Sequence, residues 1–397
     1  MSNHDNENDS ENQQDDGVID KFDQMGLKRD LLRGIYSYGF ESPSTIQQKG
    51  IVPVIKGKDS IVQAQSGTGK TLTFLAAGYQ RIDVKIKKCQ VLIITPTREL
   101  CSQILNVALG ISQHMSNIYT CCCIGGTPVS IDKNEIRRGK HMVIGTPGRI
   151  FDLINRNILD TKSIKMLIMD EADKLLSSFS QNIYEIFQYM NPDIQVALYS
   201  ATITNEIIQI TKKFMRNPFM LLVKTDDLTL EGIKQYYVNV SQEKYKQATL
   251  EDLLSGKLSL NQLIIYCNSI KKVDGITSQL IKADFTVSSM HGSMPQTDRN
   301  EVMKNFRNGR SRVLVTTDLL SRGIDVQTVS LVINYDLPTN TEEYIHRIGR
   351  SGRYGRKGTA ISFATSDDIY KIFALEKFYT TTIEEMPDPD EVNQYLQ

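Results

Sequence analysis

The chain has 397 residues, of which 40% are hydrophobic and 23% are charged, with 46 basic and 46 acidic side chains. This length is too great for one compact core and fits two domains of ordinary size. No apolar run approaches the roughly 20 residues that a membrane-spanning helix needs, and no signal peptide opens the chain, which argues against a membrane protein.

Acidic residues are concentrated at the start of the chain. Residues 1–20 carry seven acidic and no basic side chains, so a net charge of zero leaves +7 on residues 21–397. A mildly basic body is compatible with a polyanionic partner. The first 20 residues are polar, lack apolar side chains before Val18, and are predicted to be a disordered, solubilising tail.

The first half of the chain alternates apolar runs with helix-compatible stretches. A helix is expected within residues 22–38, where leucine and isoleucine recur at helical spacing. Further helices are predicted at 98–109, 182–189 and 205–214. Strands are predicted near residues 59–62, 91–95, 120–124, 142–144, 166–170 and 196–200. Such alternation indicates a mainly parallel sheet with helices on both faces, the α/β class.

A short polar stretch, residues 224–232, interrupts the pattern and is predicted to be a linker between domains spanning residues 21–223 and 233–397. The alternation then resumes, with strands expected near residues 263–267, 286–290, 312–316, 331–334 and 359–363. The second half has no phosphate-binding loop of its own. Two α/β domains with one such loop imply a site that the second domain closes.

The six cysteines predict no metal site. Cys89, Cys101, Cys121, Cys122, Cys123 and Cys267 form no paired CxxC spacing with histidines, so zinc is not expected and a reducing compartment is. The three adjacent cysteines are predicted to be inert thiols of a buried strand.

Residues 64–71 read Ala-Gln-Ser-Gly-Thr-Gly-Lys-Thr between a predicted strand and a predicted helix. Glycines allow successive backbone N–H groups to turn toward phosphate oxygens, and the N-terminus of the helix favours the same anion. The lysine can reach the β and γ phosphates, and the last threonine can hold magnesium. The signature's usual first glycine is alanine here. The predicted nucleotide-binding residues are Ala64, Gln65, Ser66, Gly67, Thr68, Gly69, Lys70 and Thr71.

Three acidic residues follow the apolar run at 166–169, where the carboxyl end of a parallel strand opens into a ligand-binding crevice. Asp170 is placed to hold Mg²⁺ through water, and Glu171 to activate the water that attacks the γ phosphate. We therefore predict an ATP site with Thr71 and Asp170 as metal ligands.

These motifs, in this order, resemble the DEAD-box ATP-dependent RNA helicases, a superfamily 2 group with two RecA-like domains of the P-loop NTPase type. The resemblance runs from Phe22 almost to the end of the chain. It implies that Phe40 stacks on adenine and Gln47 hydrogen-bonds its edge, that Asp325 faces the ribose, and that Arg350 and Arg353 act as arginine fingers. These last two lie in the run His-Arg-Ile-Gly-Arg-Ser-Gly-Arg.

The resemblance also implies an RNA site and a set of coupling residues. The coupling residues would be Asp173, Ser200, Thr202 and His346, with the hydroxyls of the strand end at 200 and 202 able to hydrogen-bond the Asp173 side chain across the sheet. The sequence shows no aromatic stacking platform interleaved with basic residues, which favours sequence-independent contact with RNA phosphates and 2′-hydroxyls. The implied RNA-binding residues are Pro96, Thr97, Arg98, Gly125, Gly126, Thr146, Pro147, Gly148, Arg149, Gly292, Arg299, Thr316 and Thr317.

Within that family the chain is similar to the eukaryotic translation initiation factor four A group, especially over residues 31–40, 319–338 and 344–358. This similarity implies a cytoplasmic, monomeric helicase of translation initiation, working with a scaffold protein of the cap-binding complex and other initiation factors. Alternatives are a nuclear paralogue that clamps RNA in exon-junction assembly and a helicase of ribosome biogenesis. A DNA-acting helicase is a further alternative.

Overall fold

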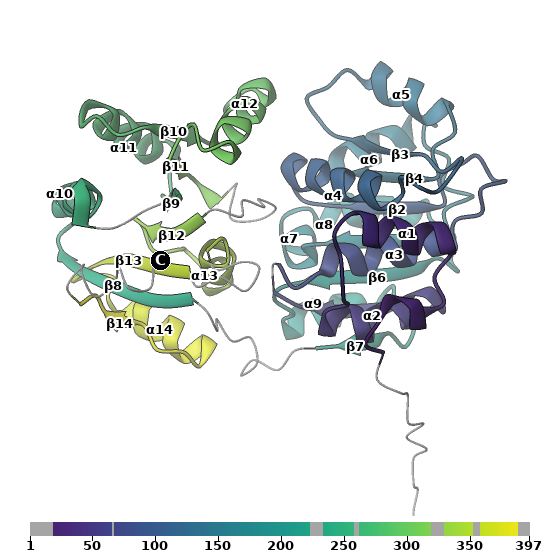
Figure 1. Cartoon of the computed structure of the whole chain (residues 1–397), viewed down its shortest axis with the longest axis horizontal. Coiled ribbons are helices and arrows are strands. Elements are labelled where there is room, and N and C mark those ends of the chain that lie inside the picture. Colours follow the sequence, from purple (N-terminus) through teal and green to yellow (C-terminus); the bar gives the residue numbers. More distant parts are fainter. Residues whose placement is uncertain are drawn as a thin grey trace, which may run out of the picture.

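The structure, a computed structural model, describes residues 19–65, 67–222, 233–257, 262–318, 329–351 and 358–387. These residues form two α/β domains, and Figure 1 shows them side by side, the first in purple to teal and the second in teal-green to yellow. The predicted tail, apart from Ile19 and Asp20, and the predicted linker lie outside the described residues.

The first domain is a seven-stranded sheet in the order β3-β4-β2-β5-β6-β1-β7, with every pair of neighbours parallel. Its elements in chain order are a short 3-10 helix η1 (Phe22–Met25), α1 (Arg29–Ser37), α2 (Thr45–Ile55), β1 (Ser60–Gln63), α3 (Lys70–Arg81), β2 (Val91–Ile94), α4 (Arg98–Ile111), β3 (Thr120–Cys123), α5 (Val129–Arg137), β4 (Met142–Gly145), α6 (Pro147–Asn155), β5 (Met166–Asp170), α7 (Ala172–Ser178), α8 (Ser180–Gln188), β6 (Gln195–Ser200), α9 (Asn205–Thr211) and β7 (Phe219–Leu221).

The alternation of side chains along each strand divides the first domain's core into two layers. In β2, Val91 and Ile93 pack with helices α1 to α4, whereas Leu92 and Ile94 pack with helices α6 to α9. Both faces of the sheet are therefore covered, which is why its central strands are apolar without interruption.

The second domain repeats this plan with its own seven-stranded parallel sheet, in the order β10-β11-β9-β12-β13-β8-β14. Its elements are β8 (Ile233–Ser241), η3 (Glu243–Tyr245), α10 (Lys246–Asp252), the π-helical turn η4 (Leu253–Lys257), β9 (Gln262–Tyr266), α11 (Ile270–Lys282), β10 (Val287–Met290), α12 (Gln296–Arg307), β11 (Val313–Thr316), β12 (Val329–Asn334), α13 (Thr341–Ile348), β13 (Gly358–Thr365), α14 (Tyr370–Tyr379) and β14 (Glu384–Glu385).

The predicted α/β class and parallel sheets are confirmed, and the predicted strands correspond to β1 to β6 and to β9 to β13. The edge strands β7 and β14, and β8, were not predicted. No described helix is long and apolar enough to span a membrane.

One expectation about the cysteines is wrong. Cys121 and Cys123 are buried free thiols, but Cys122 forms a disulfide with Cys101 of α4, their Cα atoms lying 6.5 Å apart. Alternation along β3 is the reason, because it turns Cys122 toward the layer that contains α4 while its two neighbours face the opposite layer.

Candidate active site at the domain boundary

The phosphate-binding loop leads from β1 into α3, as predicted. Gly67 and Gly69 both have left-handed backbones, with φ of 87° and 100°. At Gly69 a side chain is also excluded by space, because a Cβ there would overlap the amide of Gln47. The loop can thus expose its backbone N–H groups only with glycine at this position. Ser66 lies outside the described residues.

Lys70, the first residue of α3, bonds back to the start of the loop. Its ammonium donates a hydrogen bond of 2.6 Å to the carbonyl oxygen of Ala64, and its side chain is buried. The Thr68 hydroxyl similarly donates to the Gln65 carbonyl at 2.7 Å. A phosphate oxygen would take the place of the Ala64 carbonyl as the partner of the ammonium.

The predicted adenine-reading element is tied directly to this loop. The Ser44 hydroxyl donates to the Thr68 carbonyl at 2.7 Å, and the Gln47 amide nitrogen donates to the Gly69 carbonyl at 3.3 Å. The amide oxygen of Gln47 accepts from the Ser44 N–H at 2.8 Å, which completes a capping box at the start of α2. One N–H and one lone pair of the amide remain for a base edge. Phe40 is half-buried beside this element.

The acidic motif stands at the end of β5. Asp170 is 3% exposed, and one of its carboxylate oxygens accepts from the Glu171 N–H at 3.0 Å. Burial, with a contribution from the charge of Glu171, raises the pKa of Asp170 to about 7, while Lys70 opposes the shift. A buried carboxylate that has so little opposite charge around it is a suitable ligand for a divalent cation. The oxygen donors of Asp170 and Thr71 therefore suit Mg²⁺.

Glu171 follows with a left-handed backbone, φ of 53°, which is rare for a residue with a side chain. This conformation ends the strand and starts α7 within one residue. It places Glu171 and Asp173, both buried, at the boundary with the second domain. Backbone strain of this kind concentrates at functional sites.

The predicted coupling residues form one hydrogen-bonded cluster. Ser200 and Thr202 donate to the two carboxylate oxygens of Asp173, at 2.8 and 3.0 Å. The ring of His346, from α13 of the second domain, lies 3.3 Å from Asp173 and 3.9 Å from Glu171. His346 therefore reaches Ser200 and Thr202 through Asp173, and the cluster connects the two domains.

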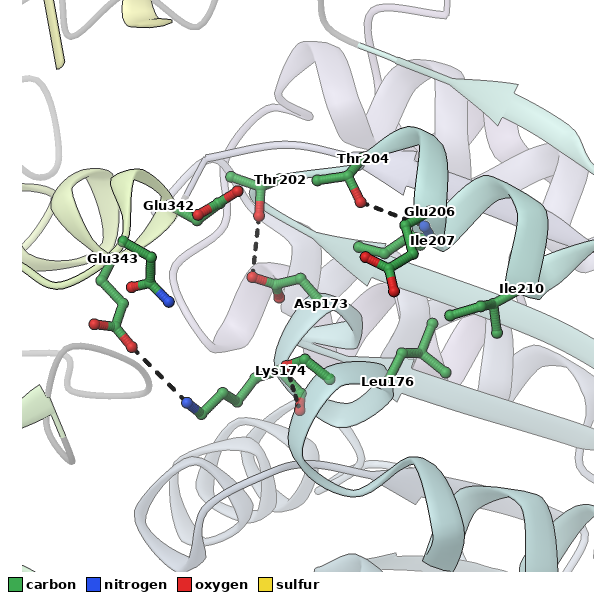
Figure 2. Close-up of a pocket in the computed structure, with 12 residues that line it drawn as sticks. Asp173, Lys174, Leu176, Thr202, Thr204, Glu206, Ile207, Ile210, Glu342 and Glu343 are labelled. Carbon is green, nitrogen blue, oxygen red and sulfur yellow. Dashed lines mark hydrogen bonds and ion pairs between the residues drawn. The ribbon is translucent and has the colours of Figure 1, made fainter. Parts of the chain in front are cut away.

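Beside this cluster, a cleft of about 210 Å³ lies between α7 and α9 of the first domain and the start of α13. Figure 2 shows Thr202 above Asp173, and Lys174 extended toward Glu343 of the second domain. That ion pair is 3.9 Å long, and Lys174 is 39% exposed, so we assign it little energy.

A second set of contacts joins the domains through α4 and α12. Glu99 accepts from Arg299 at 2.5 Å, both side chains being less than a tenth exposed. Gln296 donates to Glu99 at 3.2 Å and accepts from Arg98 at 3.2 Å. Arg299, implied by the resemblance to bind RNA, is thus committed here to a cross-domain ion pair, and Glu99, which no site prediction included, is its partner. An acidic residue in the first turn of α4 was the available signal.

Other residues implied in RNA binding lie just after strands, as predicted. Thr97 caps α4 by accepting from the Leu100 N–H at 3.2 Å, and Pro96 immediately precedes it. Arg98 also lies against Gly125 and Gly126, which follow β3. Gly148 and Gly292 are exposed.

For two of the implied RNA-binding residues the structure shows contacts within a domain. Arg149, next to Thr146 and Pro147 at the start of α6, pairs with Asp132 and donates to the Thr127 carbonyl at 2.7 Å. Thr316 is fully buried, and its hydroxyl donates to the Met290 carbonyl at 2.7 Å, so this side chain is committed within the second domain. Thr317, partly exposed, can still make that contact.

The end of α13 is fixed by a residue that the site predictions left out. Arg347 is fully buried, and its guanidinium donates to the Asp318 carboxylate at 2.5 and 2.8 Å and to the Asp336 carbonyl at 2.6 Å. It orients the helix that carries His346 and Arg350. Arg350 is buried and donates to the His346 carbonyl at 3.0 Å. Arg353 and Asp325 lie outside the described residues.

Known proteins are similar to this chain in sequence and in the arrangement of its domains. Residues 44–210 match the family described as DEAD/DEAH box helicase, and residues 245–355 match the helicase conserved C-terminal domain. The chain is 55% identical to an ATP-dependent RNA helicase eIF4A of Emericella nidulans over 94% of this chain and 93% of that protein. It is equally identical to eukaryotic initiation factor 4A of Drosophila melanogaster, over 93% and 92%.

A solved structure of S. cerevisiae Dbp5 bound to RNA and ADP BeF3 superposes with a TM-score of 0.88 at 32% identity, covering 95% of this chain and 98% of that one. A variant of Dbp5 bound instead to a Gle1 variant and IP6 superposes with a TM-score of 0.77. Sequence, fold and site agree, and the chain belongs to the DEAD/DEAH box helicase family of ATP-dependent RNA helicases.

Proposed function

We propose that this protein binds ATP in the first domain, closes both domains around RNA, and couples hydrolysis to the local opening of short RNA duplexes. The observation that carries this proposal is the buried cluster of Asp173, Ser200, Thr202 and His346, which connects the acidic motif to the second domain. The closer superposition on Dbp5 bound to RNA and nucleotide than on Dbp5 bound to Gle1 supports a closed arrangement.

In this proposal each residue has one task. Lys70 exchanges the Ala64 carbonyl for phosphate oxygens, and the glycine loop donates N–H groups to the same phosphates. Glu171 orients and accepts a proton from the attacking water. Arg350 and Arg353, carried by the second domain, stabilise negative charge on the transferring phosphoryl group only when the domains are closed.

Asp170 and Thr71 would hold the Mg²⁺ ion, which supplies charge neutralisation on the phosphates when bound. Phe40 and Gln47 would select adenine, one by stacking and one by its amide. Arg98, Gly125, Gly126 and Thr317 are exposed enough to contact an RNA backbone, and they follow strands of both domains on the side where these domains meet.

For the cellular role, we propose translation initiation in the cytoplasm, because the relatives at 55% identity over more than nine-tenths of their length are named as initiation factors or eIF4A helicases. Partners would be RNA, a scaffold protein of the cap-binding complex and other initiation factors. A nuclear location remains the alternative to be tested by localising the tagged protein.

The experiment is the ATPase rate without nucleic acid, with single-stranded RNA, and with a DNA oligomer of the same sequence. We expect strong stimulation by RNA alone, followed by multiple-turnover unwinding of short RNA duplexes. Equal stimulation by DNA would overturn the RNA assignment. ATP-dependent RNA retention without unwinding would replace the helicase with an RNA clamp.

A further inference from the structure

Two aromatic rings are stacked at the end of α1, and sequence reasoning assigned a role to only one of them. The rings of Tyr38 and Phe40 have centroids 5.5 Å apart and planes inclined by 22°. Phe40 is half-buried and packs against the core of the first domain. Tyr38 is 43% exposed and belongs to none of the hydrophobic clusters of the described residues. A large, exposed ring that covers part of the predicted adenine platform needs an explanation beyond core packing.

The backbone holds the two rings on the same side. α1 ends in a Schellman motif, in which Gly39 N–H donates to the Tyr36 carbonyl at 3.0 Å and Phe40 N–H donates to the Ile35 carbonyl at 3.3 Å. Gly39, with φ of 103°, supplies the left-handed turn that the motif requires. Residues 38 and 40 therefore come into contact because the chain reverses between them.

The ring of Tyr38 rests on α4. A Cβ at Gly110 would overlap two ring carbons of Tyr38, so the ring occupies the space that a side chain on this helix would fill. The Tyr38 ring is thus in contact both with Gly110 of α4 and with the Phe40 ring.

We propose that Tyr38 is a positioning residue for nucleotide binding: held against Gly110, it fixes the Phe40 ring so that the face left free is ready for the adenine base. The proposal rests on the proposed role of Phe40. Its physical reason is preorganisation, because a ring that already has one stacking partner loses less freedom when it gains a second. Tyr38 itself need not touch the nucleotide.

The test compares ligands with and without a base. We would measure dissociation constants of a fluorescent ADP analogue, of ATP and ADP by competition, and of inorganic tripolyphosphate, which binds the phosphate loop only. Tyr38→Ala should weaken ATP and ADP about two- to tenfold, the size of an aromatic pair, and leave tripolyphosphate unchanged. Tyr38→Phe should restore the wild-type values, because it keeps the ring.

Two further variants make the test specific. Gly110→Ala should weaken ATP binding in the wild type by displacing Tyr38, yet have no further effect in the Tyr38→Ala background. Tyr36→Ala is the matched control, because Tyr36 lies on the same helix with 39% exposure but packs against Phe22, with ring centroids 6.0 Å apart. It should leave the ratio of ATP to tripolyphosphate affinity unchanged.

The outcomes are separable from those of the proposed function. Phe40→Ala should weaken ATP binding at least as much as Tyr38→Ala does. If Phe40→Ala has no effect, the adenine platform and this proposal both fail. If Phe40→Ala weakens ATP while Tyr38→Ala does not, or if Tyr38→Ala weakens tripolyphosphate equally, the positioning role alone is overturned.

Discussion

The ion pair between Glu99 of α4 and Arg299 of α12 allows the closed state to be tested quantitatively. Glu99→Gln leaves the Arg299 guanidinium buried opposite a neutral amide. Removing one partner of a buried pair costs about 3–5 kcal/mol. When the domains separate, both side chains return to water, so this cost falls almost wholly on closure.

Part of the cost is offset in this structure. Gln296 also contacts Glu99, and it can rotate toward a substituted side chain, so we take a lower value of about 2–3 kcal/mol. At about 1.4 kcal/mol per factor of ten, the closure equilibrium should fall roughly 30- to 150-fold. The double variant with Arg299→Gln should lose less than the sum of the single variants, because no unpaired charge remains.

The assay is intramolecular energy transfer between one dye on each domain, titrated with single-stranded RNA at saturating, non-hydrolysable ATP analogue. The control is Arg216→Gln, which removes an ion pair with Asp193 whose side chains are 68% and 83% exposed within the first domain. We expect no change there. A coupling energy under about 0.5 kcal/mol between positions 99 and 299 would show that the pair does not contribute to closure.

Three other predictions concern the acidic motif. Glu171→Gln should keep ATP and RNA binding but lower the hydrolysis rate at least a hundredfold, and a wild-type single-turnover rate would contradict its role. Thr202→Val removes a hydrogen bond to the buried Asp173 carboxylate, an interaction that contributes about 1.5–3 kcal/mol. This variant should reduce the number of duplexes opened per ATP hydrolysed more than it reduces the rate of hydrolysis. Equal losses in both would argue against a coupling role for Thr202. The pKa of Asp170 is raised to about 7 in the folded state from an ordinary value near 3.8, so stability without nucleotide should fall as pH rises from about 4 to about 7. Asp170→Asn should therefore raise the melting temperature more at pH 7.5 than at pH 5, and equal shifts at both pH values would refute this.

The sequence predicted what local pattern determines. Apolar runs and glycines predicted the strands and the phosphate loop. The contact of the hydroxyls at 200 and 202 with Asp173 was expected only from the resemblance to a known family. Local pattern does not contain contacts between distant helices. Glu99 and Arg299 are 200 residues apart, and only closure of two domains brings them together.

Burial was a second limit. Thr316 and Arg149 occur in motifs that suggested contact with RNA, yet the folded chain uses both internally. Whether a hydroxyl or guanidinium faces solvent or a neighbouring carbonyl depends on how the strands and helices pack. Cys122 shows the same limit, since its pairing with Cys101 follows from the register of β3 against α4.

Every hydrophobic cluster of the described residues lies wholly within one domain, and the bonds between domains come from polar side chains. Separation of the two domains therefore exposes, at these contacts, polar and charged side chains that water can solvate. The open enzyme should remain soluble however often it passes through its cycle. For the same reason, residues 19–222 and 233–387, produced as separate polypeptides, should each fold alone and assemble only when nucleotide and RNA bring them together.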